Sequence, residues 1–299
     1  MSKQQKVAII GLGSMGYGMA KSLVAGGHQT HGFDINSDQV ARFQGEGGAP
    51  GDLMTIVGAV DALVVVVLNA AQTEAVLFGD DGAVLQMKPG SVVMACATVP
   101  PAFARDMAAR CAAYGVHYLD APISGGSVKA AQGKLSIMAA GTAEAFAAAA
   151  SVLDATAEKV FVLGAAAGVG SAMKAVNQLL AGVHIAAMAE AMTFGMTQGV
   201  SPEKFVEVIP ECAGTSWMLE NRAPHIVAGD YKPHSSVNIW PKDLGIVLDI
   251  AEEAGFDAPV TQAALAQFVE AAAQGLGGED DAAVAKVYAG QVGVTLPGE

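Results

Sequence analysis

Charged residues are scarce in this chain: of its 299 residues, only 15% are Asp, Glu, Lys or Arg. Lysine and arginine together number 16 against 29 acidic residues, so the formal net charge is −13. These few basic residues form no cluster along the sequence. Because nucleic acids are bound largely through cations that neutralise phosphate, no nucleic-acid partner is expected. A small anionic substrate needs only one or two local cations and is compatible with this composition.

Cysteine is rare too, and long apolar runs are missing. The three cysteines, Cys96, Cys111 and Cys212, are far apart in sequence, which favours reduced thiols over a disulfide framework or a zinc site. No apolar run reaches the roughly 18 residues of a membrane-spanning segment. The N-terminal apolar stretch is broken at Gly11 and is shorter than a signal peptide requires. We therefore expect a cytoplasmic protein without a membrane partner.

Hydrophobic residues, in contrast, make up 52% of the chain, which is long enough for two domains with large cores. In the first half, short apolar segments alternate with helical patterns. This alternation predicts an α/β domain over residues 1–164, with a doubly wound, mostly parallel sheet covered by helices on both faces. The expected strands lie at residues 6–10, 29–34, 62–68, 91–95, 116–120, 135–139 and 159–163.

After residue 164 the pattern becomes helical, which predicts an all-α domain over residues 165–299. A long apolar helix is expected over residues 170–198, and Ser201-Pro202 supplies an N-cap and a first-turn proline for the next helix. Because this domain is apolar on nearly all sides, we expect it to pack against another copy in a homodimer or homotetramer. Further helices are expected at residues 242–254, 260–273 and 281–288.

A glycine-rich turn directly follows the first expected strand and opens a helix. In a turn of this kind the first glycine permits the tight bend, the second lets the backbone approach a pyrophosphate, and the third lets helix and strand pack closely. Free N–H groups and the helix dipole then favour bound phosphate. The motif predicts a dinucleotide-binding Rossmann domain. It comprises Gly11, Leu12, Gly13, Ser14, Met15 and Gly16.

Asp34 ends the second expected strand, near the spacing at which dinucleotide-binding folds carry an acidic residue. A carboxylate there accepts hydrogen bonds from the ribose hydroxyls of NAD and repels the 2′-phosphate of NADP. Arg42, the nearest basic residue downstream, is expected a helical turn or two further on. The sequence therefore favours NAD as the cofactor. The alternative for Asp34 is a strand-end residue that only caps a turn.

Three polar residues interrupt the long apolar helix, namely Lys174, Asn177 and Gln178. Their spacing places them on one face, where they must reach water, a ligand or other polar groups. One interpretation is that Lys174 only extends its ammonium to solvent. The other is a catalytic lysine in a cleft between the domains. Desolvation lowers lysine pKa values toward neutrality, and alcohol oxidation requires a group that accepts the hydroxyl proton.

Four motifs in this order resemble the β-hydroxyacid dehydrogenase family, which includes 3-hydroxyisobutyrate dehydrogenase and tartronate semialdehyde reductase. The resemblance covers nearly the whole chain and implies oxidation of a small hydroxy acid with a nicotinamide cofactor. The matching segments are the glycine turn with Met19-Ala20, Asp120-Ala121-Pro122-Ile123-Ser124-Gly125-Gly126, Gly168-Val169-Gly170 leading to Lys174 and Asn177, and Lys242-Asp243-Leu244.

The resemblance also implies roles for individual residues. Lys174 would be the general acid/base, and Asn177 its partner in catalysis; both would contact the substrate. The substrate carboxylate would be bound by Ser124, Gly125 and Gly126, because such a turn exposes N–H donors to an anion. Taken alone, the same residues are also compatible with an ordinary loop after a strand.

Three further residues are implied to contact the cofactor: Asn69, Thr98 and Lys242. Thr98 would lie near the nicotinamide ribose, although Ala97 precedes it where the family usually has serine. Lys242 would reach the cofactor or the substrate from a later helix; the alternative is a surface lysine at a helix start. Gln178 stands where many members have a second asparagine, and it keeps the amide chemistry.

Several segments resemble one branch of this family, which oxidises the C2 hydroxyl of the four-carbon sugar acid L-threonate. The alternatives are 3-hydroxyisobutyrate dehydrogenase or tartronate semialdehyde reductase activity or, outside enzymes, an NAD-binding redox sensor. Residues 217 and 220–222 are expected to shape the far end of the pocket, or to pack in the core in the case of Trp217. Asp280 and Asp281 are expected to be solvated or to cap a helix. The segments of the branch are Asn69-Ala70-Ala71-Gln72, residues 177–186, Thr215-Ser216-Trp217-Met218, Glu220-Asn221-Arg222 and Gly229-Asp230-Tyr231.

Overall fold

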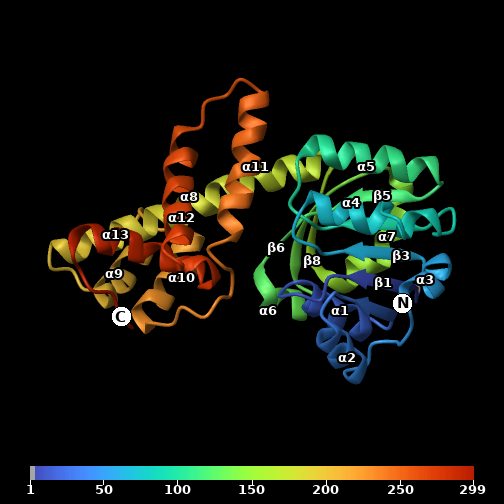
Figure 1. Ribbon diagram of the computed structural model, residues 1–299, viewed down its shortest axis with the longest axis horizontal. Coiled ribbons are helices and arrows are strands. Elements are labelled where there is room, and N and C mark those ends of the chain that lie inside the picture. Colours follow the sequence, from blue (N-terminus) through green and yellow to red (C-terminus); the bar gives the residue numbers. More distant parts are fainter. Residues whose placement is uncertain (1–3) are drawn as a thin grey trace. The chain divides into compact units, whose positions relative to one another are not determined.

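The computed structural model describes residues 4–299 and divides the chain into two compact units. The N-terminal unit runs to Lys174, and the C-terminal unit runs from Ala175 to Glu299. Figure 1 shows the N-terminal unit, coloured from blue to green, as a sheet with helices on both faces, whereas the C-terminal unit is built of helices. The expected fold class, an α/β Rossmann-type domain followed by a helical domain, is confirmed.

Eight strands form the sheet, in the order β2-β1-β3-β4-β5-β7-β6, with β8 paired to β7. Neighbours from β2 to β5 are parallel, whereas β7 pairs antiparallel with β5 and β6 and parallel with β8. The strand order reverses at β1, so its carboxyl end is the switch point at which such sheets bind their ligands. The strands are β1 (Lys6–Ile10), β2 (Gln29–Phe33), β3 (Ala62–Val65), β4 (Val92–Ala95), β5 (His117–Asp120), β6 (Ile123–Ser124), β7 (Leu135–Ala140) and β8 (Ala157–Gly164).

The central strands β1, β3 and β4 are buried on both faces of the sheet. In β1, Val7 and Ile9 belong to one hydrophobic cluster, and Ala8 and Ile10 belong to another. The first cluster includes side chains of the helices that follow β1 and β7, and the second includes side chains of the helices that follow β3 and β4. The short apolar segments that form these central strands are therefore covered on both sides, whereas β8 has exposed residues such as Val162, which is 69% exposed.

Several helices of the N-terminal unit begin at a side-chain cap. Asn36, Asp52, Asn69 and Thr142 each accept a backbone N–H of the helix that follows. Such caps satisfy donors that a helix leaves unpaired at its start. The helices are α1 (Gly16–Ala25), α2 (Ser37–Gly45), α3 (Leu53–Ile56), α4 (Ala70–Phe78), α5 (Pro101–Ala113), α6 (Gly126–Ala131) and α7 (Ala143–Thr156), with the 3₁₀ helices η1 (Val57–Ala59) and η2 (Ala83–Leu85).

Helix α8 (Val169–Thr197) begins in the N-terminal unit and continues into the C-terminal unit. Helix α10 was not anticipated because Pro224 lies inside it, and proline argues against a helix interior. Helix α11 begins at Ile239, earlier than expected, so Lys242 lies within its first turn and a half. The remaining helices are α9 (Pro202–Val208), η3 (Ile209–Glu211), α10 (Trp217–Ala228), α11 (Ile239–Glu253), α12 (Pro259–Ala273), η4 (Leu276–Gly278), η5 (Asp281–Val284) and α13 (Ala285–Val292).

Helix α8 is long and apolar enough, by length and composition alone, to cross a membrane, with a mean hydropathy of 1.4 over its most apolar window. Polar residues interrupt this helix, so it contains no unbroken apolar run of that length. The core helix of a globular protein has the same composition. Ile185, Met188 and Met192 of α8 are buried in the main hydrophobic cluster of the C-terminal unit, as expected of such a core helix.

Candidate active site

The glycine turn after β1 has the backbone that its sequence predicts. Gly11 has a φ of +95°, which residues with a side chain rarely adopt. A Cβ at Gly16 would lie 1.9 Å from the carbonyl oxygen of Gly11, so α1 packs directly on the turn. A Cβ at Gly13 would meet nothing within 4 Å, which leaves the backbone there open to a ligand. The turn therefore fits a pyrophosphate.

A cavity of about 550 Å³ lies against this turn. Asp34 lines the cavity; its Oδ2 accepts the N–H of Leu12 at 2.6 Å, and its Oδ1 accepts the N–H of Asn36 at 2.8 Å. Asp34 thus both caps the turn after β2 and presents a carboxylate beside open backbone. The cavity fits a ribose followed by a pyrophosphate, and its lining also includes Gly13, Ser14 and Gly18.

Two cations line the same cavity, namely Lys21 and Arg42. The Glu46 carboxylate lies 2.9 Å from Lys21 Nζ and 3.1 Å from Arg42 Nε. The hydrogen bonds from Lys21 and Arg42 lower the pKa of Glu46. The Arg42 guanidinium also stacks over the Tyr17 ring, 4.4 Å from its centroid. The fold therefore brings Arg42 to the cavity that Asp34 lines, which its position in the sequence did not reveal.

Asn69 and Thr98 follow β3 and β4, so they lie at the same carboxyl edge of the sheet as the glycine turn. Asn69 Oδ1 accepts the N–H of Gln72 at 2.9 Å and thereby caps α4. Thr98 is half-buried in the loop before α5. Among residues 4–299, the lining of the 550 Å³ cavity includes neither residue. The structure places both at the expected edge without bringing them into that cavity.

The segment Ser124-Gly125-Gly126 leads from β6 into α6. Gly125 has a φ of +133° and Gly126 a φ of +79°, conformations that favour glycine at both positions. A Cβ at Gly126 would meet nothing within 4 Å, so its backbone is open. The half-buried Ser124 adds a hydroxyl. These groups have the chemistry of a carboxylate-binding turn.

Lys174 is only 9% exposed. Its Nζ donates a hydrogen bond to the carbonyl oxygen of Ile123 at 2.9 Å, immediately before Ser124. The amino group of Lys174 is therefore held inside the protein rather than extended freely into solvent. The fold thus brings the candidate catalytic lysine next to the candidate carboxylate-binding turn.

The start of α8 is fixed by Asp120 at the end of β5. Its buried carboxylate accepts hydrogen bonds from Gly168 N at 2.7 Å, Ser171 N at 2.9 Å and Ser171 Oγ at 2.7 Å. Burial raises the pKa of Asp120, and these hydrogen bonds offset part of that effect. A Cβ at Gly170 would lie 2.5 Å from a carbonyl oxygen of β7, so this end of the helix packs directly on the sheet. Asp120 lies in one of the family motifs, but its anchoring role depends on the fold.

Further along α8, four polar residues of the C-terminal unit form one chain of contacts. Asn177 Nδ2 donates to Gln178 Oε1 at 2.9 Å, and Gln178 Nε2 donates to Asp243 Oδ2 at 2.5 Å. Lys242 Nζ lies 2.6 Å from Asp243 Oδ1. We call these residues the amide chain. The motifs predicted Asn177 and Lys242 as site residues, but assigned no such role to Gln178 or Asp243.

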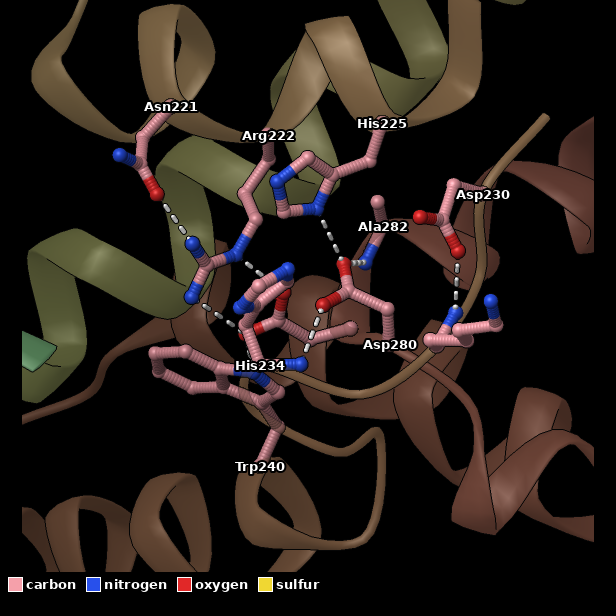
Figure 2. Close-up of polar contacts among 10 residues, drawn as sticks. Asn221, Arg222, His225, Asp230, His234, Trp240, Asp280 and Ala282 are labelled. Atoms are coloured by element: carbon pink, nitrogen blue, oxygen red, sulfur yellow. Dashed lines mark hydrogen bonds and ion pairs between the residues drawn. The ribbon is translucent and has the colours of Figure 1, made fainter. Parts of the chain in front are cut away.

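A second polar cluster of the C-terminal unit joins α10 to α11 and η5 (Figure 2). Arg222 Nε lies 2.5 Å from Asp281 Oδ1, and Trp240 Nε1 donates to Asp281 Oδ2 at 3.0 Å. His225 Nδ1 lies 2.9 Å from Asp280 Oδ1. Both aspartates are fully buried. Asp280 caps η5, which is one of the two roles expected of it, whereas Asp281 is not solvated as expected.

The residues expected at the far end of the pocket have different surroundings. Trp217 is 61% exposed and does not pack in the core. Glu220 accepts a hydrogen bond from Thr215 Oγ1 at 2.8 Å, and Asn221 Oδ1 accepts one from Arg222. Arg222 belongs to the buried cluster. These contacts assign none of the four to a substrate pocket.

A glycine turn at the switch point of a Rossmann sheet, followed by a buried lysine beside an open serine-glycine turn, defines a class of protein. The turn suits a dinucleotide, and the lysine suits proton transfer at an anionic substrate. That class is the nicotinamide-dependent dehydrogenases of small hydroxy acids.

Known proteins that are similar to this chain belong to the same class. Residues 6–164 match the family model of the NAD binding domain of 6-phosphogluconate dehydrogenase, and residues 168–288 match that of the NAD-binding of NADP-dependent 3-hydroxyisobutyrate dehydrogenase. The chain is 49% identical to L-threonate dehydrogenase of Cupriavidus necator over 99% of both lengths. It is 46% identical to L-threonate dehydrogenase of Escherichia coli strain K12, over 98% of this chain and 96% of the relative. The crystal structure of 3-hydroxyisobutyrate dehydrogenase from Salmonella typhimurium is similar too, with 46% identity, a TM-score of 0.89 and coverage of 94% of this chain and 99% of that one.

The chain therefore belongs to the family of 3-hydroxyisobutyrate dehydrogenase-like hydroxyacid dehydrogenases. The resemblance stated from the motifs, the enzyme class and the nicotinamide cofactor are confirmed. Because relatives over the full length are named as dehydrogenases, the alternative of a non-catalytic redox sensor is not supported.

Proposed function

We propose that this enzyme oxidises the C2 hydroxyl of L-threonate with NAD as the hydride acceptor. The observation that carries the proposal is the buried Lys174, whose Nζ contacts the Ile123 carbonyl oxygen next to the Ser124-Gly125-Gly126 turn. This arrangement puts a proton acceptor beside donors that suit a carboxylate. The choice of substrate is supported by relatives named L-threonate dehydrogenase that match nearly the full chain.

Lys174 performs the proton transfer in this scheme. When bound, NAD supplies an acceptor for the hydride that leaves the substrate carbon. The hydroxyl proton must leave as well, and the neutral amine of Lys174 takes it at Nζ. The hydrogen bond to Ile123 orients this nitrogen, and the burial of the side chain limits competition from water.

The substrate is held by groups on either side of this lysine in the sequence. The Ser124 hydroxyl and the N–H groups of Gly125 and Gly126 bind the carboxylate. Asn177 lies one helical turn after Lys174 on the same face of α8, and its amide binds the substrate.

The cofactor is held by the glycine turn and by residues at the carboxyl edge of the sheet. Gly11, Leu12, Gly13, Ser14, Met15 and Gly16 bind the pyrophosphate, Asn69 and Thr98 contact the nicotinamide side, and Lys242 contacts the cofactor or the substrate. The carboxylate of Asp34 binds the adenosine ribose and disfavours the 2′-phosphate of NADP. The open backbone at Gly13 and the cavity that Asp34 lines support this assignment.

A substrate panel tests the proposal. The purified enzyme is assayed with NAD and L-threonate, 3-hydroxyisobutyrate or glycerate, and with NADH and tartronate semialdehyde. We expect the highest kcat/KM with L-threonate, by at least about tenfold, because a site that hydrogen-bonds extra hydroxyls rejects substrates that lack them. A higher kcat/KM with 3-hydroxyisobutyrate would reassign the substrate to the activity for which the similar Salmonella structure is named.

We further propose a cytoplasmic homodimer or homotetramer, assembled through the helical domain that follows residue 164. Exposed apolar side chains of α8, including Val176, Leu180 and the 67% exposed Phe194, support an interface between copies. Free thiols support a reducing compartment: Cys96 and Cys111 are buried, and burial raises the pKa of Cys111 to about 12. Light scattering during size-exclusion chromatography is expected to give a mass of two or four times 30.1 kDa. A monomer mass would refute the assembly.

A further inference from the structure

The hydrogen-bond directions in the amide chain follow from the chemistry of Asp243. This residue is 2% exposed, and an ionised carboxylate has no proton to donate. Only the NH₂ group of Gln178 can therefore face it. The carbonyl oxygen of Gln178 must then face Asn177, which offers its own NH₂ group in return. The direction of both amides is thus determined by the charge at one end.

This ordering decides what Asn177 offers to a ligand. With its Nδ2 directed to Gln178, Asn177 has its carbonyl oxygen Oδ1 available to accept a hydrogen bond from a ligand hydroxyl. If the amide were reversed, the same ligand would meet an N–H donor instead. The two states have nearly the same shape, so packing alone selects weakly between them.

Burial strengthens the preference for one orientation of the Gln178 amide. Gln178 is also buried, and reversing it would set its carbonyl oxygen against the carboxylate of Asp243. Two acceptors facing each other without water are strongly unfavourable. The helices that carry these residues approach closely, since a Cβ at Gly182 of α8 would lie 2.8 Å from Leu244 of α11.

We propose that Asp243 is a positioning residue that determines, through Gln178, which end of the Asn177 amide faces the substrate hydroxyl. The inference rests on the proposed function, because it takes Asn177 as a substrate ligand. Asp243 acts only through its neighbours. Its second oxygen contacts Lys242 Nζ, so the same carboxylate also positions that lysine.

The first variant is Asp243→Asn, which keeps the shape and removes the constraint, since an amide can face Gln178 with either end. With L-threonate and NAD, we expect kcat to fall roughly tenfold to a hundredfold, the range for losing one buried polar contact. KM should change less, because a reversed Asn177 still fills the same space. The matched control is Asp249→Asn, which removes an exposed carboxylate from the same helix and should leave kcat and the thermal midpoint unchanged.

The decisive variant exchanges the charge between the two positions. In Gln178→Glu alone, two carboxylates face each other, and we expect activity to be low. In the double variant Gln178→Glu/Asp243→Asn, the new amide on α11 donates to the new carboxylate on α8, whose other oxygen accepts from Asn177 as the glutamine oxygen does in the wild type. Both substitutions are isosteric. We expect kcat to return to within roughly threefold of wild type, a coupling that independent sites do not show.

Binding provides a readout apart from turnover. In both Asp243→Asn and the double variant, Lys242 loses its contact with the Asp243 carboxylate, so the NAD dissociation constant should change equally in the two. Only kcat should recover on charge exchange. Thermal midpoints, measured for every variant, separate loss of folding from loss of positioning.

Two outcomes would overturn the inference: Asp243→Asn with the kcat of wild type, or a folded double variant whose kcat is no better than that of Asp243→Asn. The variant Asn177→Ala separates this from failure of the proposed function. If Asn177→Ala retains full kcat, the substrate role of Asn177 is wrong. If it loses kcat while charge exchange gives no recovery, Asn177 acts without the constraint from Asp243.

Discussion

At the scale of single residues, the proposed proton transfer depends on where the amine of Lys174 is held. Lys174 Nζ is buried, and its hydrogen bond to the Ile123 carbonyl oxygen orients it. This contact therefore orients the nitrogen that we propose as the proton acceptor.

Replacing Lys174 by alanine tests this role directly. We expect Lys174→Ala to lower kcat by roughly 10²–10⁴-fold, the usual contribution of a general acid/base. The NAD dissociation constant should stay close to wild type, because the glycine turn is untouched. The exposed Lys134 provides the control, and Lys134→Ala should have normal kcat. Unchanged turnover in Lys174→Ala would show that the proton leaves by another route.

Asp34 is expected to decide between NAD and NADP. In Asp34→Asn the charge that repels a 2′-phosphate is lost, while Lys21 and Arg42 remain in the same cavity. We expect the ratio of kcat/KM for NADP to that for NAD to rise at least about tenfold, the effect of one favourable charge contact. Steady-state kinetics with both cofactors measure it. The exposed Asp38 of α2 gives the control Asp38→Asn, and an equal response of both variants would argue against a specific role for Asp34.

At the scale of elements, the close approach of α8 and α11 holds the amide chain together. A Cβ at Gly182 would lie 2.8 Å from Leu244 Cδ2 and 2.9 Å from Trp240 Cε3, so even one methyl group does not fit without movement. Glycine normally weakens a helix, which makes a glycine inside α8 a packing requirement rather than a local preference.

The variant Gly182→Ala should therefore destabilise the protein although alanine is the better helix former. We expect a loss of about 1–3 kcal/mol in the free energy of unfolding, as for other overpacked sites. A Cβ at Gly245 of α11 would meet nothing within 4 Å. Gly245→Ala should accordingly stabilise the protein by about 0.5–1 kcal/mol. Urea unfolding measures the free energy of unfolding of both variants. If both variants changed this free energy in the same direction, the packing argument would be wrong.

At the scale of the whole molecule, each unit depends on buried groups that are distant in sequence. In the N-terminal unit, Asp120 anchors the start of α8 from the end of β5. In the C-terminal unit, Arg222 and Trp240 both contact Asp281, which ties α10 and α11 to η5 (Figure 2). Burying a charge is costly unless a partner compensates it, so such pairs restrict the ways in which helices can assemble.

Removing one partner of the buried pair should weaken the fold. Arg222→Met keeps most of the side-chain volume but leaves the Asp281 carboxylate buried without its cation. We expect a loss of about 3–5 kcal/mol in unfolding free energy. Lys204→Met breaks an exposed pair with Glu207 and should leave the urea midpoint unchanged. Equal midpoints for the two variants would show that the buried pair contributes nothing to stability.

Much of the N-terminal fold was predictable, because its signals are local. The continuous apolar segments of the buried strands, caps such as Asp52, and the positive φ of Gly11 follow from nearby residues and backbone sterics. The two-residue strand β6 and helix α10 were missed. The first is shorter than any periodic pattern, and the second contains Pro224, so local signals argued against both.

The sequence by itself determined the nucleotide turn, the acidic residue after β2, the order of the motifs and the presence of a polar face on an apolar helix. Tertiary structure alone decided which groups meet. It brought Lys174 to Ile123, Gln178 to Asp243 and Arg222 to Asp281, each pair separated by more than fifty residues. Backbone sterics and periodicity act between neighbours in the chain, and a sequence displays them. The partner of a buried polar group depends on how whole helices pack, and that is settled only when the chain is folded.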